Sequence, residues 1–183
     1  MKKESEAYIE NGIFTEKGLG TVVVCRYKSN GSAEVGVFLV DVWCLGVKSA
    51  FFTRFDSPAD QEYKLNSFYR GDVPQPEPAA NGRKLIEDAV TYAKSLGIAP
   101  SSDYKKGARV FGGIDVKEAT RRYTFGKDGK PYYISGPDDD SDRIVRILRN
   151  RLGEHGFVAM IADEAFGDFL NETFPGSEEV EKK

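Results

Sequence analysis

Carboxylates are the side chains of this sequence best suited to bind a metal or to act as acid and base. The run Asp138-Asp139-Asp140-Ser141-Asp142 places four of them within five residues. Clustered carboxylate oxygens bind hard cations such as Mg²⁺. The same residue types also cap helix N-termini, where they accept hydrogen bonds from free N–H groups and oppose the helix dipole. Helix capping is the favoured interpretation, and a metal site made by Asp138, Asp139, Asp140 and Asp142 is the alternative.

A further carboxylate, Asp41, interrupts the apolar run between Val35 and Val47. A buried carboxylate must be hydrogen-bonded, paired with a cation or bound to a metal. Lys48 is a candidate partner for Asp41. The alternative is catalytic: Asp41 would act with Asp115 or with the 138–142 run in a metal-dependent, nuclease-like hydrolase that uses Mg²⁺.

The counts of histidine and cysteine exclude other kinds of site. The 183-residue chain has one histidine, His155, and two cysteines, Cys25 and Cys44. These cannot build a multi-histidine metal site, a zinc ribbon or an iron–sulfur cluster. Both cysteines lie in predicted strands, where a thiol is more often a packing residue than a nucleophile. No cofactor is therefore expected outside the carboxylate alternative.

Charge is unevenly distributed along the chain. The whole sequence has 26 basic and 29 acidic residues, a net charge of −3, but residues 104–151 hold 12 basic and 7 acidic residues. Aromatic residues are interleaved with these basic ones, which is typical of surfaces that contact phosphates and stack on bases. The alternative is a solvated basic face with its aromatic side chains in the core. The predicted nucleic-acid contacts are Arg121, Arg122, Lys127, Lys130, Tyr132 and Tyr133.

The elements that must position these residues follow an α+β pattern. An N-terminal antiparallel meander is packed by helices, and a second β-hairpin and a C-terminal helix-strand unit follow. The meander strands are predicted over residues 20–28, 33–44 and 49–55. Helices are predicted over 58–69, 82–96 (capped by Asn81), 142–152 and 163–171, and a short one that is capped by residues 101–103 and reaches about Phe111. The second hairpin is predicted over 122–125 and 131–135, and the last strand over 156–161.

The first hairpin carries a prediction about register. Asn30-Gly31 is a strong signal for a two-residue turn. With that turn, Cys25 lies opposite Gly36 and far from Cys44. A disulfide between the two cysteines is therefore not expected.

Length and composition favour a single domain. Residues 1–12 are predicted to be a flexible N-terminus, 13–175 one globular α+β domain, and 176–183 a disordered charged tail. No secretory signal and no apolar stretch long enough to cross a membrane is present, so a cytoplasmic protein is expected.

Four stretches together resemble a family of uncharacterised bacterial proteins. They are GVFLVDVWCLGVK (36–48), FGGID (111–115), FGKDGKPYY (125–133) and GPDDD (136–140). The resemblance covers about residues 18–162 and brings no known activity with it. It implies that one structural unit contains Asp41, Cys44, Lys48, Tyr104, Asp115 and the 136–140 segment.

The sequence thus predicts a cytoplasmic binding or regulatory module. The favoured partner is nucleic acid or a nucleoprotein complex, with a protein complex or self-association also open. Membrane association is not expected. The metal-dependent hydrolase is the alternative.

Overall fold

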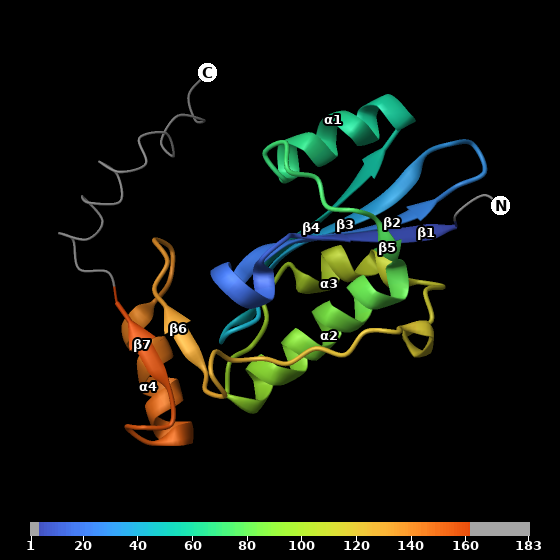
Figure 1. Cartoon of the computed structure of the whole chain (residues 1–183). Helices are drawn as coiled ribbons and strands as arrows, with labels where there is room; N and C mark the ends of the chain where they lie inside the picture. Colours follow the sequence, from blue (N-terminus) through green and yellow to red (C-terminus); the bar gives the residue numbers. More distant parts are fainter. Residues whose placement is uncertain (1–3, 162–183) are drawn as a thin grey trace.

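A computed structural model describes residues 4–161 and has a five-stranded sheet at its centre (Figure 1). Its strand order is β4-β3-β2-β1-β5, and neighbouring strands are antiparallel. The strands are β1 (Ser5–Ile9), β2 (Leu19–Tyr27), β3 (Ala33–Asp41), β4 (Gly46–Phe55) and β5 (Glu77–Pro78). The predicted α+β class with an N-terminal antiparallel meander is therefore confirmed.

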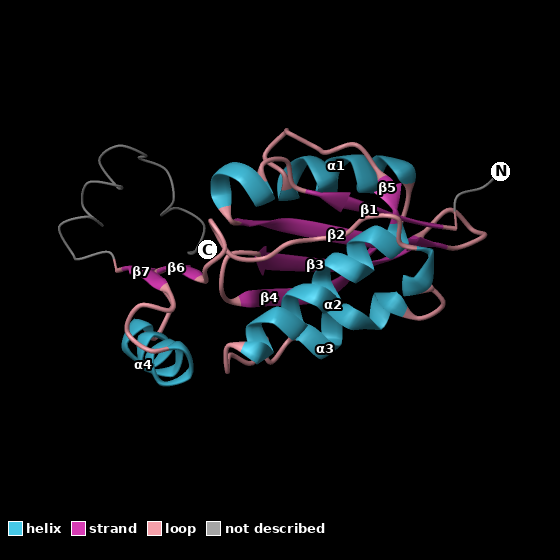
Figure 2. Cartoon of the chain, turned by 60° about the horizontal axis from the view of Figure 1, so that its bottom comes forward, coloured by secondary structure: helices cyan, strands magenta, loops and turns pink. Residues whose placement is uncertain are grey.

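Helices cover both faces of this sheet. Helix α1 (Pro58–Phe68) lies over one face, and α2 (Ala79–Ser95) and α3 (Tyr104–Gly107) lie side by side over the other (Figure 2). Strand β2 alternates between the two cores, since Val22 and Val24 pack toward α2 while Val23 and Cys25 pack toward α1. The central strands are apolar on both faces for this reason. None of the helices described between residues 4 and 161 is long and apolar enough to cross a membrane.

The prediction of a flexible N-terminus is wrong for residues 5–9. Residues 5–9 form β1, which pairs with β2 on one side and β5 on the other. Ala7 is completely buried, and the buried Glu6 accepts a 2.6 Å hydrogen bond from the Tyr8 hydroxyl. The polar composition of residues 1–12 predicted a loose segment. The buried Glu6 carboxylate is instead satisfied by hydrogen bonds from the hydroxyls of Tyr8 and Tyr27. Residues 1–3 lie outside the described part.

The first hairpin has a three-residue loop in place of the predicted two-residue turn. The Lys28 N–H donates to the Ser32 carbonyl (2.8 Å), and Gly31 takes the left-handed conformation with φ +89°. Cys25 therefore pairs with Val35, one position from the predicted Gly36. Such a loop needs only one residue with positive φ, and the glycine supplies it. Both cysteines are buried and free, as expected.

The second, smaller sheet exists, but its strands are parallel. Strand β6 (Tyr132–Ile134) pairs with β7 (Val158–Met160), and α4 (Ser141–Leu152) makes the crossover between them. Residues 122–125, the predicted partner of β6, are not a strand. The turn at 126–130 does form, yet the backbone on either side of it bonds elsewhere: Gly126 N–H donates to the Val42 carbonyl and Tyr132 N–H to the Trp43 carbonyl. These tertiary bonds replace the hairpin ladder.

Asn81 ties a distant segment to α2 and does not cap the helix. Helix α2 begins at Ala79, and the Asn81 side chain is buried. Its Oδ1 accepts hydrogen bonds from the N–H groups of Thr120 (2.9 Å) and Arg121 (3.2 Å). Three single-turn helices complete the described part: η1 (Ile13–Lys17), η2 (Ala108–Phe111) and η3 (Val116–Glu118). The helix predicted over 163–171 and the tail at 176–183 lie outside the described residues.

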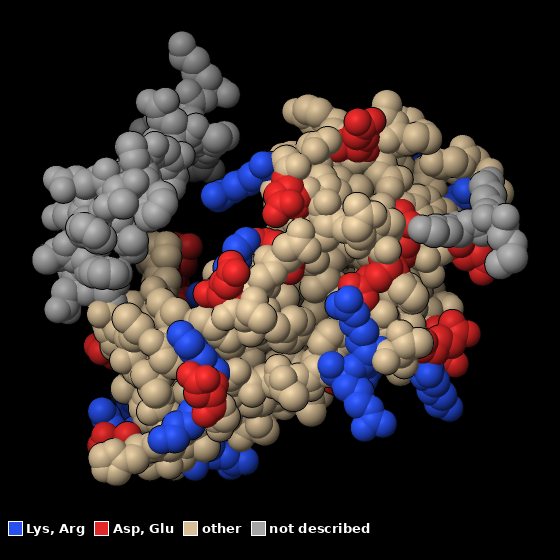
Figure 3. All heavy atoms as spheres, in the orientation of Figure 1, with Lys and Arg blue, Asp and Glu red and all other residues tan. Residues whose placement is uncertain are grey.

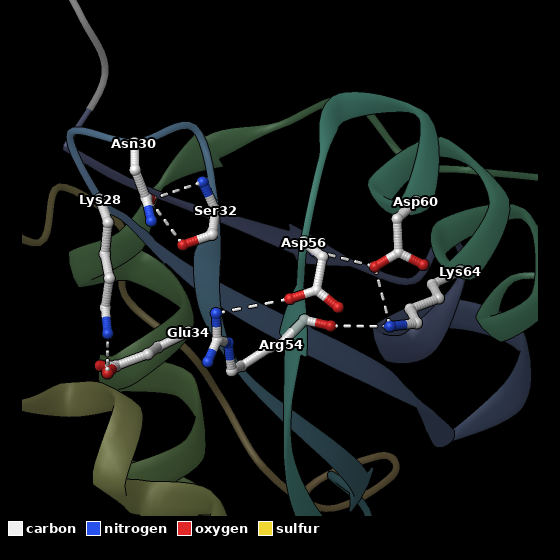
Figure 4. Close-up of polar contacts among 8 residues, drawn as sticks. All are labelled: Lys28, Asn30, Ser32, Glu34, Arg54, Asp56, Asp60 and Lys64. Atoms are coloured by element: carbon white, nitrogen blue, oxygen red, sulfur yellow. Dashed lines mark hydrogen bonds and ion pairs between the residues drawn. The ribbon is translucent and has the colours of Figure 1, made fainter.

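Ion pairs fix the hairpin-loop end of the sheet and the start of α1 (Figure 4). Lys28 Nζ lies 2.7 Å from Glu34 Oε1 on the facing strand, and Arg26 contacts the other oxygen of Glu34. The bonds from Lys28 and then Arg26 lower the pKa of Glu34 to about 2. Because the folded-state pKa is below the ordinary value of 4.5, this carboxylate stabilises the fold above pH 4.5, and the stabilisation is lost as the pH falls toward 2.

Replacement of this carboxylate should flatten the acid limb of the stability profile. We expect Glu34→Gln to lose less stability than the wild type between pH 4.5 and pH 2, measured as the urea midpoint at several pH values. Asp56→Asn is the control, because the Asp56 carboxylate is 73% exposed in its ion pair with Arg54 and exposed pairs contribute little. An unchanged pH dependence in Glu34→Gln would contradict the assignment.

Candidate functional site

Asp41 stands at the end of a strand and shapes the turn that follows. Strand β3 ends at Asp41, three residues before the predicted Cys44, so this carboxylate is not in mid-strand. Its Oδ1 accepts hydrogen bonds from the N–H groups of Trp43 (2.8 Å) and Cys44 (2.9 Å). Burial raises the pKa of Asp41, while the backbone N–H groups of the turn and the nearby Lys48 oppose that shift. The buried carboxylate is thus satisfied by the 42–45 turn.

Lys48 pairs with Asp139 from the acidic run and not with Asp41. The Lys48 ammonium lies 2.9 Å from Asp139 Oδ1, and both side chains are largely buried. Asp139 Oδ2 also accepts a 2.8 Å bond from the Gly136 N–H and a 3.3 Å bond from the Tyr133 hydroxyl. These contacts of Asp139 join β4 to the segment before α4.

The other members of the acidic run do not converge on a common point. Asp140 caps α4, because its Oδ1 accepts a 3.1 Å hydrogen bond from the Arg143 N–H. Asp138 and Asp142 are exposed. Among the described residues, no group of three or more His, Cys, Asp or Glu side chains is placed to hold a metal ion. The capping interpretation is confirmed at Asp140, and the metal site stays an alternative prediction.

Asp115 lies at the opposite end of the sheet from Asp41. Asp115 lies three residues after Gly112, near the start of β3. The Gly112 carbonyl accepts a bond from Arg26, and Arg26 pairs with Glu34 at the beginning of that strand. Asp41 is seven residues further along that strand, about 23 Å away at the rise of a β-strand. Asp115 instead begins η3, where its Oδ1 accepts from the Lys117 N–H at 2.9 Å. The predicted catalytic pairing of Asp41 with Asp115 is therefore wrong.

The structural unit implied by the family resemblance forms only in part. The 42–45 turn, Lys48 and the 136–140 segment meet at one end of the molecule, and Cys44 shares a small apolar cluster with Tyr133. Tyr104 instead packs on Phe38 over the main sheet, and Asp115 is remote.

The six predicted nucleic-acid residues occupy two separate places. Arg121 and Arg122 follow Thr120, which is bound to the beginning of α2, and Arg121 pairs with Glu77 at 3.2 Å. Lys127 and Lys130 lie near the other end of that helix, where Phe125 stacks on Tyr92. Helix α2 has 17 residues and is about 25 Å long. Figure 3 shows basic and acidic side chains interspersed on the face it draws, with no continuous basic surface.

The two predicted stacking tyrosines differ in accessibility. Tyr133 is completely buried beneath α4 beside Leu148, so it cannot stack on a base, and that prediction is wrong. Tyr132 is half-buried and meets Trp43 edge-on at 5.6 Å between ring centroids. The Lys127 ammonium lies 4.5 Å from the Trp43 ring centroid and 4.6 Å from that of Tyr132. Because side chains alternate along β6, Tyr133 points into the core and Tyr132 lies near the surface.

A pocket of about 190 Å³ opens between the 42–45 turn and β6. Asp41 and Lys48 line it together with Trp43 and Tyr132. The remaining lining residues are Lys17, Gly18, Leu19, Ile134, Ser135 and Gly136. The volume is below the roughly 300–1,000 Å³ of small-molecule sites, so the pocket suits one side chain better than a cofactor.

An exposed apolar surface adjoins this pocket. In the parallel register, Tyr132 pairs with Val158 and Ile134 with Met160, so these four side chains share the face of the small sheet turned away from α4. Ile134 is 46% exposed and Met160 48%. We use the term terminal apolar face for Leu19, Ile134, Val158, Met160 and Ile161. Five of the seven exposed large apolar side chains in residues 4–161 therefore lie on this face or at its edge.

Sequence reasoning missed the terminal apolar face. It depends on which residue of β6 lies opposite which residue of β7, and these strands are separated by a complete helix. The available signal was the uncharged run from Phe157 to Ala162, which looks like any short buried strand.

Gly18 is required where the pocket wall meets Trp43. It adopts φ +68°, and a Cβ added there would lie 2.1 Å from Trp43 Cδ2. We expect Gly18→Ala to lower the free energy of unfolding by about 3 kcal/mol or more, from backbone strain and overpacking together. Gly113→Ala is the control, because Gly113 has φ +86° with open space around it. That variant should lose only about 1–2 kcal/mol. Urea unfolding followed by circular dichroism measures both, and equal losses would contradict the steric role.

Comparison with known proteins brings no further assignment. No family model matches the chain, and the comparisons with curated proteins and with solved structures found no match. Membership of the uncharacterised bacterial family accordingly stays a prediction that rests on the four motifs.

Proposed function

We propose that the protein is a protein-binding module that docks a partner through the terminal apolar face. The observation that carries this proposal is the gathering of five exposed large apolar side chains beside one pocket. Large contiguous patches of exposed apolar side chains are uncommon on monomeric proteins and often mark interaction sites. The cytoplasm is the proposed location, which the free cysteines support.

The pocket supplies an anchor point for such a partner. Leu19 and Ile134 belong both to the pocket wall and to the terminal apolar face, so one apolar side chain can enter the pocket while its neighbours cover the face. Binding energy at protein interfaces concentrates in anchors of this kind.

Strand β7 also offers a free edge. Among the described residues, its only strand neighbour is β6. Natural sheets protect open edges with charged residues or proline, and residues 158–161 contain neither. An extended apolar peptide can therefore add as a strand beside β7 while its side chains contact the face.

Peptide selection tests this docking surface. We expect a random display library panned on the full chain to yield peptides rich in apolar residues that bind the wild type. Ile134→Lys should weaken their binding at least about tenfold, because a charge is then placed at the centre of the apolar contact. Tyr63→Lys is the matched control, since Tyr63 is 75% exposed but lies on α1. Equal binding to both variants, or selection of no peptide, would contradict the proposal.

Nucleic acid is a second candidate partner, favoured by one specific observation. Lys127 and Lys130 flank the turn next to Tyr132, and Arg143 and Arg146 are exposed on α4 of the same unit. Basic side chains beside an accessible aromatic ring can bind phosphates and a stacked base. Arg122 is exposed near the start of α2, so only a longer nucleic-acid strand would contact it together with Lys127 and Lys130.

Salt dependence distinguishes this second candidate. We expect the affinity for a labelled single-stranded oligonucleotide to fall as salt rises. Combined Lys127→Gln and Lys130→Gln substitution should reduce the log–log slope by about 1.4. Lys64→Gln on α1 is the control. A salt-independent affinity, or a slope unchanged by the double substitution, would contradict a nucleic-acid role.

A further inference from the structure

We propose that residues 162–174 of this same chain occupy the terminal apolar face and compete there with a partner. The inference rests on the proposed function, because it names the regulation of that docking surface.

The position of the segment is the first argument. Strand β7 ends at Met160, and Ile161, the last described residue, is itself exposed at the edge of the face. Twenty-two residues follow it directly. A segment joined to its binding site by so short a connection has an effective concentration of about millimolar order. Even a weak intrinsic affinity is then enough for occupancy.

The composition of the segment is the second argument. Phe166, Phe169 and Leu170 follow the i, i+3, i+4 spacing that places side chains on one face of a helix, and a helix is predicted there from the sequence. These large apolar side chains match a face formed by isoleucine, valine and methionine. One phenyl ring also suits a pocket of about 190 Å³ that has an aromatic wall.

Charge complementarity is the third argument. Residues 162–183 contain seven acidic residues and two lysines, a net charge of −5. The cationic side chains beside the face are Lys17, which also pairs with Glu10, and Lys127 and Lys130 of the neighbouring turn. An acidic segment complements this rim.

Charge also argues against a second copy as the occupant. If two molecules met through this face, each would bring the same basic rim to the interface. Like charges placed opposite one another disfavour association. The acidic segment of the same chain removes that conflict.

A spin label tests where the segment lies. Cys25 and Cys44 are buried, so Thr173→Cys in the full chain provides a single accessible thiol for the label. We expect the label to broaden the methyl NMR signals of Ile134 and Met160, but not that of Leu65, the buried leucine of α1. Adding Phe166→Ser with Phe169→Ser should restore the intensities, whereas the matched control Val180→Ser should not. No broadening, or broadening that survives the double substitution, would overturn the inference.

A mixed sample tests the second copy directly. Spin-labelled protein without isotope is combined with isotope-labelled protein without a spin label. If the segment binds its own chain, the Ile134 and Met160 signals stay sharp. Broadening in this sample would show binding between copies and would overturn the inference.

Peptide affinity separates this inference from the proposed function. We expect Phe166→Ser with Phe169→Ser to tighten binding of the selected peptides about tenfold, because the competing segment is removed. If the spin label reports docking but no peptide binds either protein, the proposed function fails and only the docking of residues 162–174, without competition, is supported. If peptides bind in an Ile134-dependent way but the label reports no docking, the inference alone fails.

Discussion

The buried ion pair between Lys48 and Asp139 is the contact on which the arrangement of the molecule depends. It joins β4 to a segment 91 residues later, and the Gly136 N–H and the Tyr133 hydroxyl complete the bonding of the carboxylate. Loss of one partner would leave a charge in a largely buried position, which typically costs more than the pair itself contributes. Together with the bond from the Tyr132 N–H to the Trp43 carbonyl, this contact holds β6 beside the turn after β3, where the pocket lies.

The acidic residues that looked catalytic have structural roles, because each is held by its own hydrogen-bond donors or ion-pair partner. Asp41 is held by two N–H groups of its own turn, Asp139 by Lys48, and Asp140 by the first turn of α4. Each carboxylate thus has its own donors at a different place in the fold. Carboxylates that act together on a metal must instead direct oxygens at one point. What remains accessible at this end of the molecule is mainly apolar surface with lysines beside it.

Local patterns predicted the elements whose signals are local. The helix start at residue 58 and the aspartate cap of α4 follow from short-range signals, and both are present. The meander follows from β-branched runs between turn residues. The parallel pairing of β6 with β7 was not predictable in this way, because the Val42 and Trp43 carbonyls take the N–H groups that a hairpin would have used. The parallel pairing of β6 with β7 also determines that Tyr133 is buried and that Ile134 and Met160 are exposed, which sequence reasoning missed.

The β6–α4–β7 unit packs on the main body through an apolar cluster that is separate from the two cores of the main sheet: Tyr133 and Leu148 meet Cys44, Leu45 and Leu96 there. Its attachment to the sheet includes polar contacts, among them the Lys48 ion pair and the backbone bonds from Gly126 and Tyr132. A unit attached through one small cluster and a few polar contacts can open at a free energy below that of global unfolding. Amide hydrogens of β6 and α4 should then exchange with solvent together and earlier than those of β2 and β3. The pocket, which has walls from both units, would be the first feature to disappear in that opening.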